Sequence, residues 1–286
     1  MLDVLYDSLL DCLKLLPFLF LSYLAVEYIE HRMGAQTKKW IYQAGKAGPV
    51  IGSLIGMIPQ CGFSAAAAGL YAAGIVSPGT LIAIFLSTSD EMLPIMLSEG
   101  MDLSVIIRIL AIKAATGAVV GLLVDFVAEK LRLWKANEGA IRNLCEHGHC
   151  HCGEHGIVRA ALRHTEKTAV FLFLVTLVLG FGMEWFGATA FSRGIFAIPG
   201  IQMAVAALIG MIPNCAASVM ITQLYLEGVL SGGSLFAGLL CGAGTGLLVL
   251  FRENENRKEC LALTVTLYVS GLLAGSLIGC LGWRPV

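Results

Sequence analysis

The sequence feature that most constrains the fold is a nine-residue stretch that occurs twice. Leu54-Ile-Gly-Met-Ile-Pro-Gln-Cys-Gly62 returns 154 residues later as Leu208-Ile-Gly-Met-Ile-Pro-Asn-Cys-Ala216. The match continues without a gap, and 16 of the 33 positions from Leu54 to Leu86 are identical to their counterparts. A fixed internal repeat decides the architecture before other features are considered. We therefore expect two structurally related halves.

Each copy of the repeat consists of two apolar arms separated by a proline. In the first copy the arms cover residues 48–58 and 63–76, and Pro59 removes a backbone donor and disfavours helix at Ile58. At 1.5 Å per residue, each arm spans about half of a ~30 Å hydrocarbon core. The copy is therefore either a kinked spanning helix or a re-entrant hairpin with its tip near the midplane. We favour the hairpin, because paired broken segments are typical of transporter binding sites.

The composition indicates an integral membrane protein. The chain is 57% hydrophobic and 14% charged, whereas a soluble domain carries about 25% charged residues. A net charge of −1 gives no reason to expect nucleic-acid binding. The first apolar run has no basic region before it and no small-residue cleavage site after it, so we expect no removable signal peptide.

The positions of lysine and arginine predict how the chain crosses the membrane. Residues 31–46 and 129–167 are rich in basic side chains and are therefore expected to be cytoplasmic, whereas 98–102 is a short acidic outer turn. This topology closes only if the hairpin segments do not cross. The expected hairpins are 48–76 and 200–229, and the expected spans are 9–29, 79–97 and 103–127 in the first half and 168–186, 234–251 and 260–282 in the second.

An odd number of crossings in each half makes the two repeats inverted. We therefore predict an all-α polytopic membrane protein with two inverted repeats, each made of three spanning helices and a proline-broken re-entrant hairpin. This gives ten segments if the hairpin arms are counted separately. The expected division is an N-terminal membrane repeat (1–133), a cytoplasmic His/Cys-rich loop (134–166) and a C-terminal membrane repeat (167–286).

Charged side chains within the predicted spans mark a candidate site. Asp90 and Glu91 lie deep in the segment 79–97, where a charge costs at least about 2.5–3.5 kcal/mol unless it is paired or hydrated. Lys113 is the expected counter-charge at similar depth, with Arg108 nearer the surface. A buried ion pair that only joins two helices is the structural alternative. We favour a cation or proton site, because none of these charges occurs at the matching position of the second repeat.

The two hairpin tips supply further candidate ligands. Thiolates favour soft or borderline ions, whereas carboxylate and amide oxygens favour harder ions such as Mn²⁺, so a mixed set suits Zn²⁺, Mn²⁺ or trivalent arsenic without choosing among them. A buried cysteine is by default a small apolar residue, but both tips carry it directly after Pro-Gln or Pro-Asn. The predicted substrate- or ion-binding residues are Gln60, Cys61, Ser87, Ser89, Asp90, Glu91, Asn214 and Cys215.

A second candidate metal site lies in the loop between the halves. Dense Cys/His tracts are typical of metal binding, but the spacing here matches no closed zinc finger, which needs separated ligand pairs. We interpret the tract as a flexible chelating segment that buffers or senses metal at the cytoplasmic mouth, and a solvated linker is the alternative. Its candidate ligands are Cys145, His147, His149, Cys150, His151, Cys152 and His155.

At these residues the chain resembles the prokaryotic ten-transmembrane heavy-metal exporters, a family also labelled manganese transporters and related to arsenic-efflux permeases. The resemblance rests on Met-Ile-Pro-Gln-Cys-Gly at 57–62, Ser-Thr-Ser-Asp-Glu-Met-Leu-Pro at 87–94, Pro-Asn-Cys at 213–215 and the His/Cys loop, and it covers essentially the whole chain. It implies ten transmembrane segments and the export of a metal or metalloid, without fixing which one.

Together these features predict a secondary-active transporter of the cell inner membrane. It would export a heavy-metal or metalloid ion of the Mn, Zn or arsenite class through a midplane site between the hairpin tips. The alternative is a permease for a small sulfur- or arsenic-containing organic species or oxyanion, with Lys113 and the helix ends at the tips as the anion site.

An enzyme is disfavoured, because the sequence contains neither H-E-x-x-H nor G-x-S-x-G. The chain also lacks a nucleotide-binding P-loop, which excludes ATP-driven transport within this chain and leaves protons or the membrane potential as the drive, or a partner ATPase. We expect no required cofactor, only Zn or Mn as substrate or loop-bound ion. The expected partners are the lipid bilayer, the transported ion, protons as a candidate coupling ion, and a second copy in a candidate homodimer.

Overall fold

All regular secondary structure in the residues that the structure, a computed structural model, describes is helical. The described residues are 47–59, 62–89, 92–130, 157–186, 199–254 and 256–282, together with residues 5, 6, 8–10, 12–14, 16, 17, 19–21, 23 and 24 of an N-terminal helix. The first half contains α3 (Gly48–Gly56), α4 (Gly62–Ala72), α5 (Pro78–Ser87), α6 (Met92–Ser98) and α7 (Leu103–Lys130). The second contains α9 (Ile157–Phe186), α11 (Pro199–Gly210), α12 (Cys215–Leu226), α13 (Gly232–Cys241), α14 (Gly246–Glu253) and α15 (Arg257–Cys280).

The helices of the two halves begin at matching positions of the sequence repeat. α13, α14 and α15 each begin 154 residues after α5, α6 and α7. The turns before α5 and α13 also match, because Gly74 (φ 73°) and Gly228 (φ 75°) both take the left-handed conformation that glycine adopts readily. Ser77 and Ser231 then cap the two helices by accepting hydrogen bonds from the third residue on. The duplicated sequence thus gives the same succession of helices twice.

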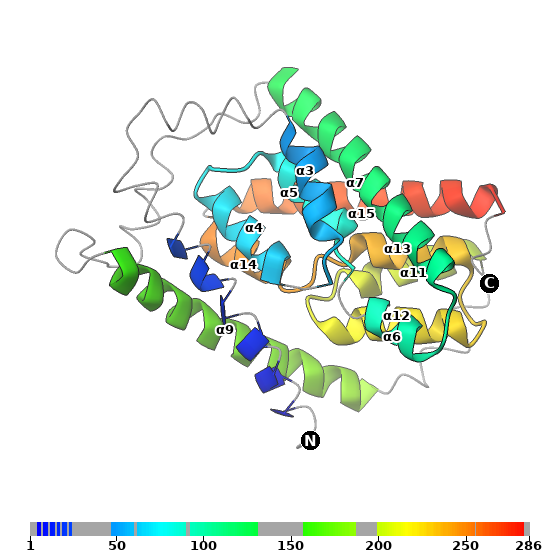
Figure 1. Cartoon of the computed structure of the whole chain (residues 1–286), viewed down its shortest axis with the longest axis horizontal. Helices are drawn as coiled ribbons and strands as arrows, with labels where there is room; N and C mark the ends of the chain where they lie inside the picture. Colours follow the sequence, from blue (N-terminus) through cyan, green and yellow to red (C-terminus); the bar gives the residue numbers. More distant parts are fainter. Residues whose placement is uncertain are drawn as a thin grey trace.

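The two halves are interlocked. α5 packs against α3 and α7, and α13 packs against α11 and α15. Further contacts cross between the halves, because α4 packs on α14 and α12 packs on α6 (Figure 1). One continuous apolar core therefore spans both halves, and it includes the fully buried side chains of Phe85 and Phe236.

Glycines allow the long helices to approach the central ones closely. A Cβ on Gly121 of α7 would stand 2.5 Å from the Gly79 carbonyl oxygen of α5, and a Cβ on Gly275 of α15 would stand 2.7 Å from the Gly233 carbonyl oxygen of α13. Side chains essentially never approach backbone oxygens so closely, so both contacts require glycine. Small residues at such contacts are the usual means by which membrane helices pack.

Two predicted spans are interrupted, which corrects the expectation that 79–97 and 234–251 are continuous helices. α5 ends at Ser87 and α6 begins at Met92, and α13 is separated from α14 at 242–245. Pro94 lies in the first turn of α6, where a backbone N–H has no helical acceptor, so it favours a helix start there. In the second break Gly244 has a φ of 52°, which a residue with a side chain would rarely adopt.

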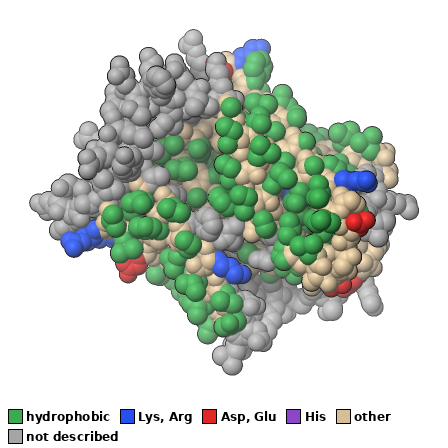
Figure 2. Space-filling model, viewed as in Figure 1, with side chains coloured by type: hydrophobic (Ala, Val, Ile, Leu, Met, Phe, Trp, Pro, Cys, Tyr) green, Lys and Arg blue, Asp and Glu red, His purple; other side chains and the backbone are tan. Residues whose placement is uncertain are grey.

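Four stretches of the described chain are long and apolar enough to cross a membrane. They are Pro78–Ser98, Leu103–Lys130, Gly232–Glu253 and Arg257–Cys280, and they coincide with four of the predicted spans. The predicted span 168–186 lies within α9, which begins inside the segment assigned to the polar loop, while 9–29 is described only in part. Apolar side chains cover much of the face shown in Figure 2. Val119 and Leu123 of α7 are among the exposed apolar residues of the described chain. The chain is a polytopic membrane protein.

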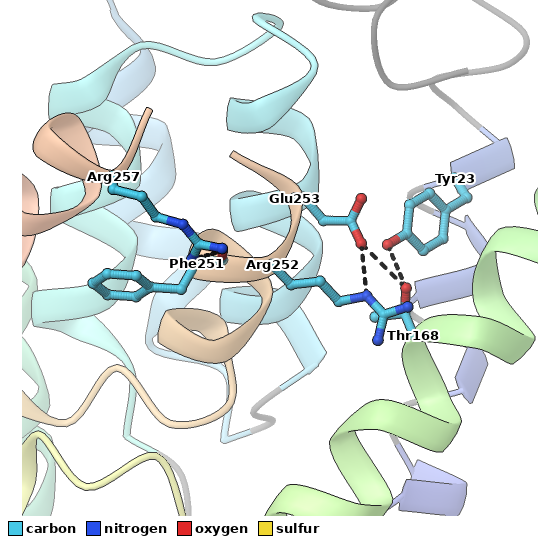
Figure 3. A network of polar contacts seen from close by, with 6 residues as sticks. All are labelled: Tyr23, Thr168, Phe251, Arg252, Glu253 and Arg257. Atoms are coloured by element: carbon cyan, nitrogen blue, oxygen red, sulfur yellow. Dashed lines mark hydrogen bonds and ion pairs between the residues drawn. The ribbon is translucent and has the colours of Figure 1, made fainter. Parts of the chain in front are cut away.

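The N-terminal helix and α9 lie side by side and are attached to the end of α14 by polar contacts. The hydroxyl groups of Tyr23 and Thr168 are 2.9 Å apart, and Thr168 also donates to Oε1 of Glu253 at 3.3 Å. Arg252 pairs with the same Glu253 oxygen at 3.4 Å (Figure 3). The Tyr23 ring also stacks on His164 of α9, with ring centroids 5.4 Å apart. This cluster holds the helix pair against the core.

Candidate functional site

The helix interruptions surround a small buried cavity in the middle of the protein. Its wall combines the break after α5, the break after α13, the tip between α11 and α12, and one side chain of α7. The cavity volume is about 10 Å³, room for roughly one water molecule. The lining residues are Thr88, Ser89, Lys113, Gly210, Ile212, Asn214, Ser218, Gly238, Leu239, Gly242 and Gly244.

Lys113 brings a cation to this cavity. Its side chain is fully buried, and its Nζ donates to the carbonyl oxygen of Leu239 at 2.6 Å. Leu239 lies in the last turn of α13, where carbonyl groups lack helical partners and carry the negative end of the helix dipole. A buried ammonium must be hydrogen-bonded to be tolerated. The end of α13 therefore stabilises the charge on Lys113 next to the cavity.

Ser87 and Ser89, both predicted site residues, are placed differently. Ser89 lines the cavity, and its hydroxyl donates to the Met57 carbonyl oxygen at 2.9 Å, which joins the first break to the first hairpin tip. Ser87 instead donates to the Ala83 carbonyl oxygen one turn earlier in α5, at 2.8 Å. Of these two serines, only Ser89 lines the cavity.

The second tip supplies Asn214 and Cys215. Asn214 lines the cavity and is also the N-cap of α12, because its Oδ1 accepts a hydrogen bond from the Ala216 N–H at 3.0 Å. The oxygen expected to bind a cation is thus already used for capping, which leaves the amide N–H groups for an acceptor. Cys215 is buried in the first turn of α12 and is not a lining residue.

Arg108 does not join Lys113 at the cavity, which corrects the predicted grouping. Arg108 is exposed on α7. Five residues along an α-helix correspond to a rotation of about 140°, so the two side chains point in different directions. Gln60, Cys61, Asp90 and Glu91 lie outside the described residues, as do the loop ligands from Cys145 to His155, and their roles stay predictions.

Several polar groups of this region were not anticipated. Thr88 and Ser218 line the cavity. Ser218 is identical to Ser64 at the matching position of the first repeat, so the sequence repeat could have identified it as a candidate. Thr245, in the break after α13, is 2% exposed, and its hydroxyl has no hydrogen-bond partner in the described part of the chain. Gly242 and Gly244 are the sequence features that could have indicated this break.

The described residues do not form a metal site by themselves. Within them, no three His, Cys, Asp or Glu side chains are grouped closely enough to hold a metal ion. A metal bound at the cavity would therefore need ligands from the predicted residues outside that part, namely Gln60, Cys61, Asp90 and Glu91.

Comparison with known proteins agrees with this architecture. The model of a family described as "Putative, 10TM heavy-metal exporter" matches residues 2–198, which is more than half of the chain. The chain belongs to this family. The match to the heavy-metal exporter family covers the first repeat, the His/Cys loop and the whole of α9. No curated protein and no solved structure matches the chain.

Proposed function

We propose that this member of the heavy-metal exporter family is a secondary-active transporter that moves a heavy-metal or metalloid ion, of the Mn, Zn or arsenite class, through the buried cavity. The observation that carries the proposal is the convergence of the helix breaks of both repeats on one small cavity whose wall includes Lys113. Irregular backbone at membrane depth is tolerated only where it is surrounded by protein or lines a cavity. Interrupted helices that meet in the middle of the membrane are typical of substrate sites in secondary transporters.

The lengths of the arms support re-entrant hairpins. α3 has 9 residues and α4 has 11, while α11 and α12 have 12 each. At 1.5 Å per residue these helices are about 14–18 Å long, which is roughly half of the hydrocarbon core. Arms of this length reach the midplane and turn back there, so the tips lie at the depth of the cavity.

The grouping of the turns supports an inverted arrangement of the repeats. Tyr71 and Pro78, at the α4–α5 turn, share a cavity wall with Glu259 at the start of α15. Asp102, at the start of α7, shares a wall with Ser231 at the α12–α13 turn. The α4–α5 turn thus lies beside the connection between α14 and α15. In the same way, the α12–α13 turn lies beside the connection between α6 and α7. This grouping is expected when the repeats are related by a two-fold axis in the membrane plane.

In the proposed cycle, the chain's own residues bind and hold the ion at the cavity. Asp90, directly after Ser89, and Glu91 would supply carboxylates, while Cys61 and Gln60 would supply thiolate and amide ligands from the first tip. Lys113 would balance the carboxylates when the ion has left. Protons or the membrane potential would drive export across the cell inner membrane, with loops 31–46 and 129–167 on the cytoplasmic side.

Flux of Mn²⁺, Zn²⁺ and arsenite in proteoliposomes tests this function. Asp90→Asn removes one charge-assisted contact worth about 1.5–3 kcal/mol and should weaken metal affinity about ten- to a hundred-fold. Asp90→Asn combined with Lys113→Met should fold but not transport. Wild-type flux in that double variant would mean that the residues form only a structural pair, because replacing a buried ion pair by neutral groups is often harmless. The control is Arg108→Met, which removes a cation that lies on the same helix but outside the cavity.

One observation favours the second candidate, a permease for a small sulfur- or arsenic-containing organic species or oxyanion. Among the described lining residues, Lys113 is the one charged side chain, and the free amide N–H groups of Asn214 suit an acceptor. Loss of flux in Lys113→Met together with normal flux in Asp90→Asn would support this permease over the metal-ion exporter.

A further inference from the structure

The two ends of the molecule are related by the repeat, but their described residues are joined by different contacts. The first end, here the 73–77 end, contains the α4–α5 turn, the end of α7 and the start of α15. The second, here the 227–231 end, contains the α12–α13 turn, the start of α7 and the end of α15. Because equivalent positions are 154 residues apart, the two ends can be compared residue by residue.

At the 73–77 end, a hydrogen bond joins α4 to α15. The hydroxyl of Tyr71, which is 3% exposed, donates to Oε1 of Glu259. The other carboxylate oxygen of Glu259 accepts from Nδ2 of Asn256 at 3.3 Å, so the carboxylate is held from both sides. The second arm of the first hairpin is thereby fastened to the second repeat.

A second carboxylate fastens the turn itself. Asp125 of α7 accepts hydrogen bonds from the Ser77 hydroxyl at 2.6 Å and from the Gly79 N–H at 2.7 Å. These bonds satisfy the start of α5 with a group from α7. The 73–77 turn is therefore tied to both long helices.

The 227–231 end lacks both carboxylates. The repeat places Val105 where Glu259 stands and Gly279 where Asp125 stands. The turn is held instead by Gln202 of α11, whose Nε2 donates to the Val229 carbonyl oxygen at 2.7 Å and whose Oε1 accepts from Ser234 at 2.9 Å. This turn is thus tied to its own hairpin by Gln202, with neither of the carboxylates that fasten the 73–77 turn to the long helices.

A cavity of about 1210 Å³ lies at the 227–231 end, with Val105, Tyr225 and Gly279 in its wall and Glu99 and Asp102 at the start of α7. At the other end, the groove beside Tyr71 is about 790 Å³ and runs between α7 and α15. Its wall includes the exposed apolar side chains of Val119 and Leu273, which suit lipid rather than an aqueous path.

We propose that the Tyr71–Glu259 hydrogen bond is the gate that closes the 73–77 end, and that the structure is the state open at the 227–231 end. The inference rests on the proposed transport function, since a gate requires a path. In the proposed cycle, substrate would pass between the 1210 Å³ vestibule and the buried cavity, whose lining residues are separate in this structure. It would reach the opposite face only when Tyr71 separates from Glu259. In the expected topology the 73–77 end is cytoplasmic, so the open vestibule faces outward.

Backbone hydrogen–deuterium exchange of the purified protein tests the gate without any substrate. Glu259→Val and Tyr71→Phe should each make the amides of residues 69–80 exchange about tenfold faster, because a hydrogen bond to a charged acceptor is lost. Exchange in residues 223–234 should not change. Glu129→Gln, which removes an exposed carboxylate of the same end, is the matched control and should change neither segment.

A variant at the 227–231 end tests the same difference between the two ends from the other side. Val105→Glu places a carboxylate opposite Tyr225 and should slow exchange in residues 223–234 several-fold, and Val105→Gln does the same with a neutral acceptor if the glutamate variant does not fold. Glu259→Val combined with Val105→Glu should then close the second end and open the first.

The outcomes separate the gate from the transport function. Exchange of residues 69–80 that stays at the wild-type rate in both Tyr71→Phe and Glu259→Val would falsify the gate, whatever the flux. Altered exchange in a protein that transports none of Mn²⁺, Zn²⁺ or arsenite would instead retain the gate and overturn the proposed substrate class.

Discussion

Nζ of Lys113 donates to the carbonyl oxygen of Leu239, so the buried cation of the first repeat is held by a helix end of the second. The contact is not reciprocal, because the repeat places Leu267 at the position equivalent to Lys113. The Lys113–Leu239 hydrogen bond between the two halves therefore has no counterpart at the matching positions of the repeat.

Replacing Lys113 should cost stability as well as transport. Lys113→Met leaves the buried Leu239 carbonyl without this donor, a loss of about 1–3 kcal/mol. We expect a lower thermal midpoint in detergent, measured by intrinsic fluorescence. Arg108→Met, on the exposed side of α7, should change the free energy of unfolding by no more than about 0.5 kcal/mol and so leave the midpoint nearly unchanged. Equal effects of the two substitutions would contradict the role given to Lys113.

Glycine at position 121 should be irreplaceable. Gly121→Ala places a Cβ 2.5 Å from the Gly79 carbonyl oxygen and should destabilise the protein by about 1–3 kcal/mol, because the helices must move apart. Gly279→Ala is the matched control, since its nearest neighbour would be 3.7 Å away. Thermal unfolding of both variants measures the difference. A stable Gly121→Ala protein would show that the α5–α7 contact tolerates a side chain.

Acidification should weaken the contact between the N-terminal helix and α9. Burial lowers the pKa of His164 below its ordinary value, with Lys167, Arg252 and Arg163 acting in the same direction and Glu253 against it. The folded protein therefore binds fewer protons than the unfolded chain. Stability from the neutral ring is complete above the unfolded value of about 6.5 and is lost as the pH falls below it. The wild-type midpoint should drop more between pH 7.5 and 5.5 than that of His164→Gln, and parallel drops would refute this.

Side-specific labelling tests the expected topology. Single cysteines at Gln43 and Asn137, in a background without native cysteines, should react only with reagents on the cytoplasmic side. A cysteine at Gly100, in the α6–α7 turn, should react only from outside. Labelling of Gln43 and Asn137 from opposite sides would be incompatible with inverted repeats.

Deleting Cys145–His155 should leave transport in place, because these ligands are expected outside the membrane. The metal content of the purified protein should fall, and the metal dependence of flux should shift. A variant with the same length and serine at the seven ligand positions separates loss of ligands from shortening of the loop. Loss of all flux in the folded serine variant would place the loop on the transport path.

The sequence repeat located most helices, because proline and glycine interrupt apolar segments in a way that can be seen directly. Breaks at Pro59 and Pro213 were predicted, and α3 and α11 end three residues before those prolines. The breaks after α5 and α13 were missed, since a long apolar segment with a short interruption still has the overall composition of a continuous span. Pro94 and Gly244 were the available signals.

The details of the site depended on long-range contacts that periodicity does not carry. Lys113 and Leu239 are 126 residues apart, and only the packed structure brings a helix end to the ammonium. Lys113 and Arg108 were predicted as counter-charges from their depths in the span, whereas the direction of each side chain depends on which neighbours α7 has. The capping role of Asn214 could have been anticipated, because asparagine before a helix is a preferred N-cap.

The packing of α4 on a helix of the other half also affects how the protein assembles during synthesis. α4 ends at Ala72, and the helix on which it packs, α14, begins only at Gly246. Ribosomes add about 5–20 residues per second, so α4 waits roughly 10–35 s in the bilayer before its permanent neighbour emerges. During that time the face of α4 that will pack on α14 must be covered by lipid chains, by the insertion machinery or by another nascent chain. The packing of the first half is thus incomplete until the last quarter of the chain has been made.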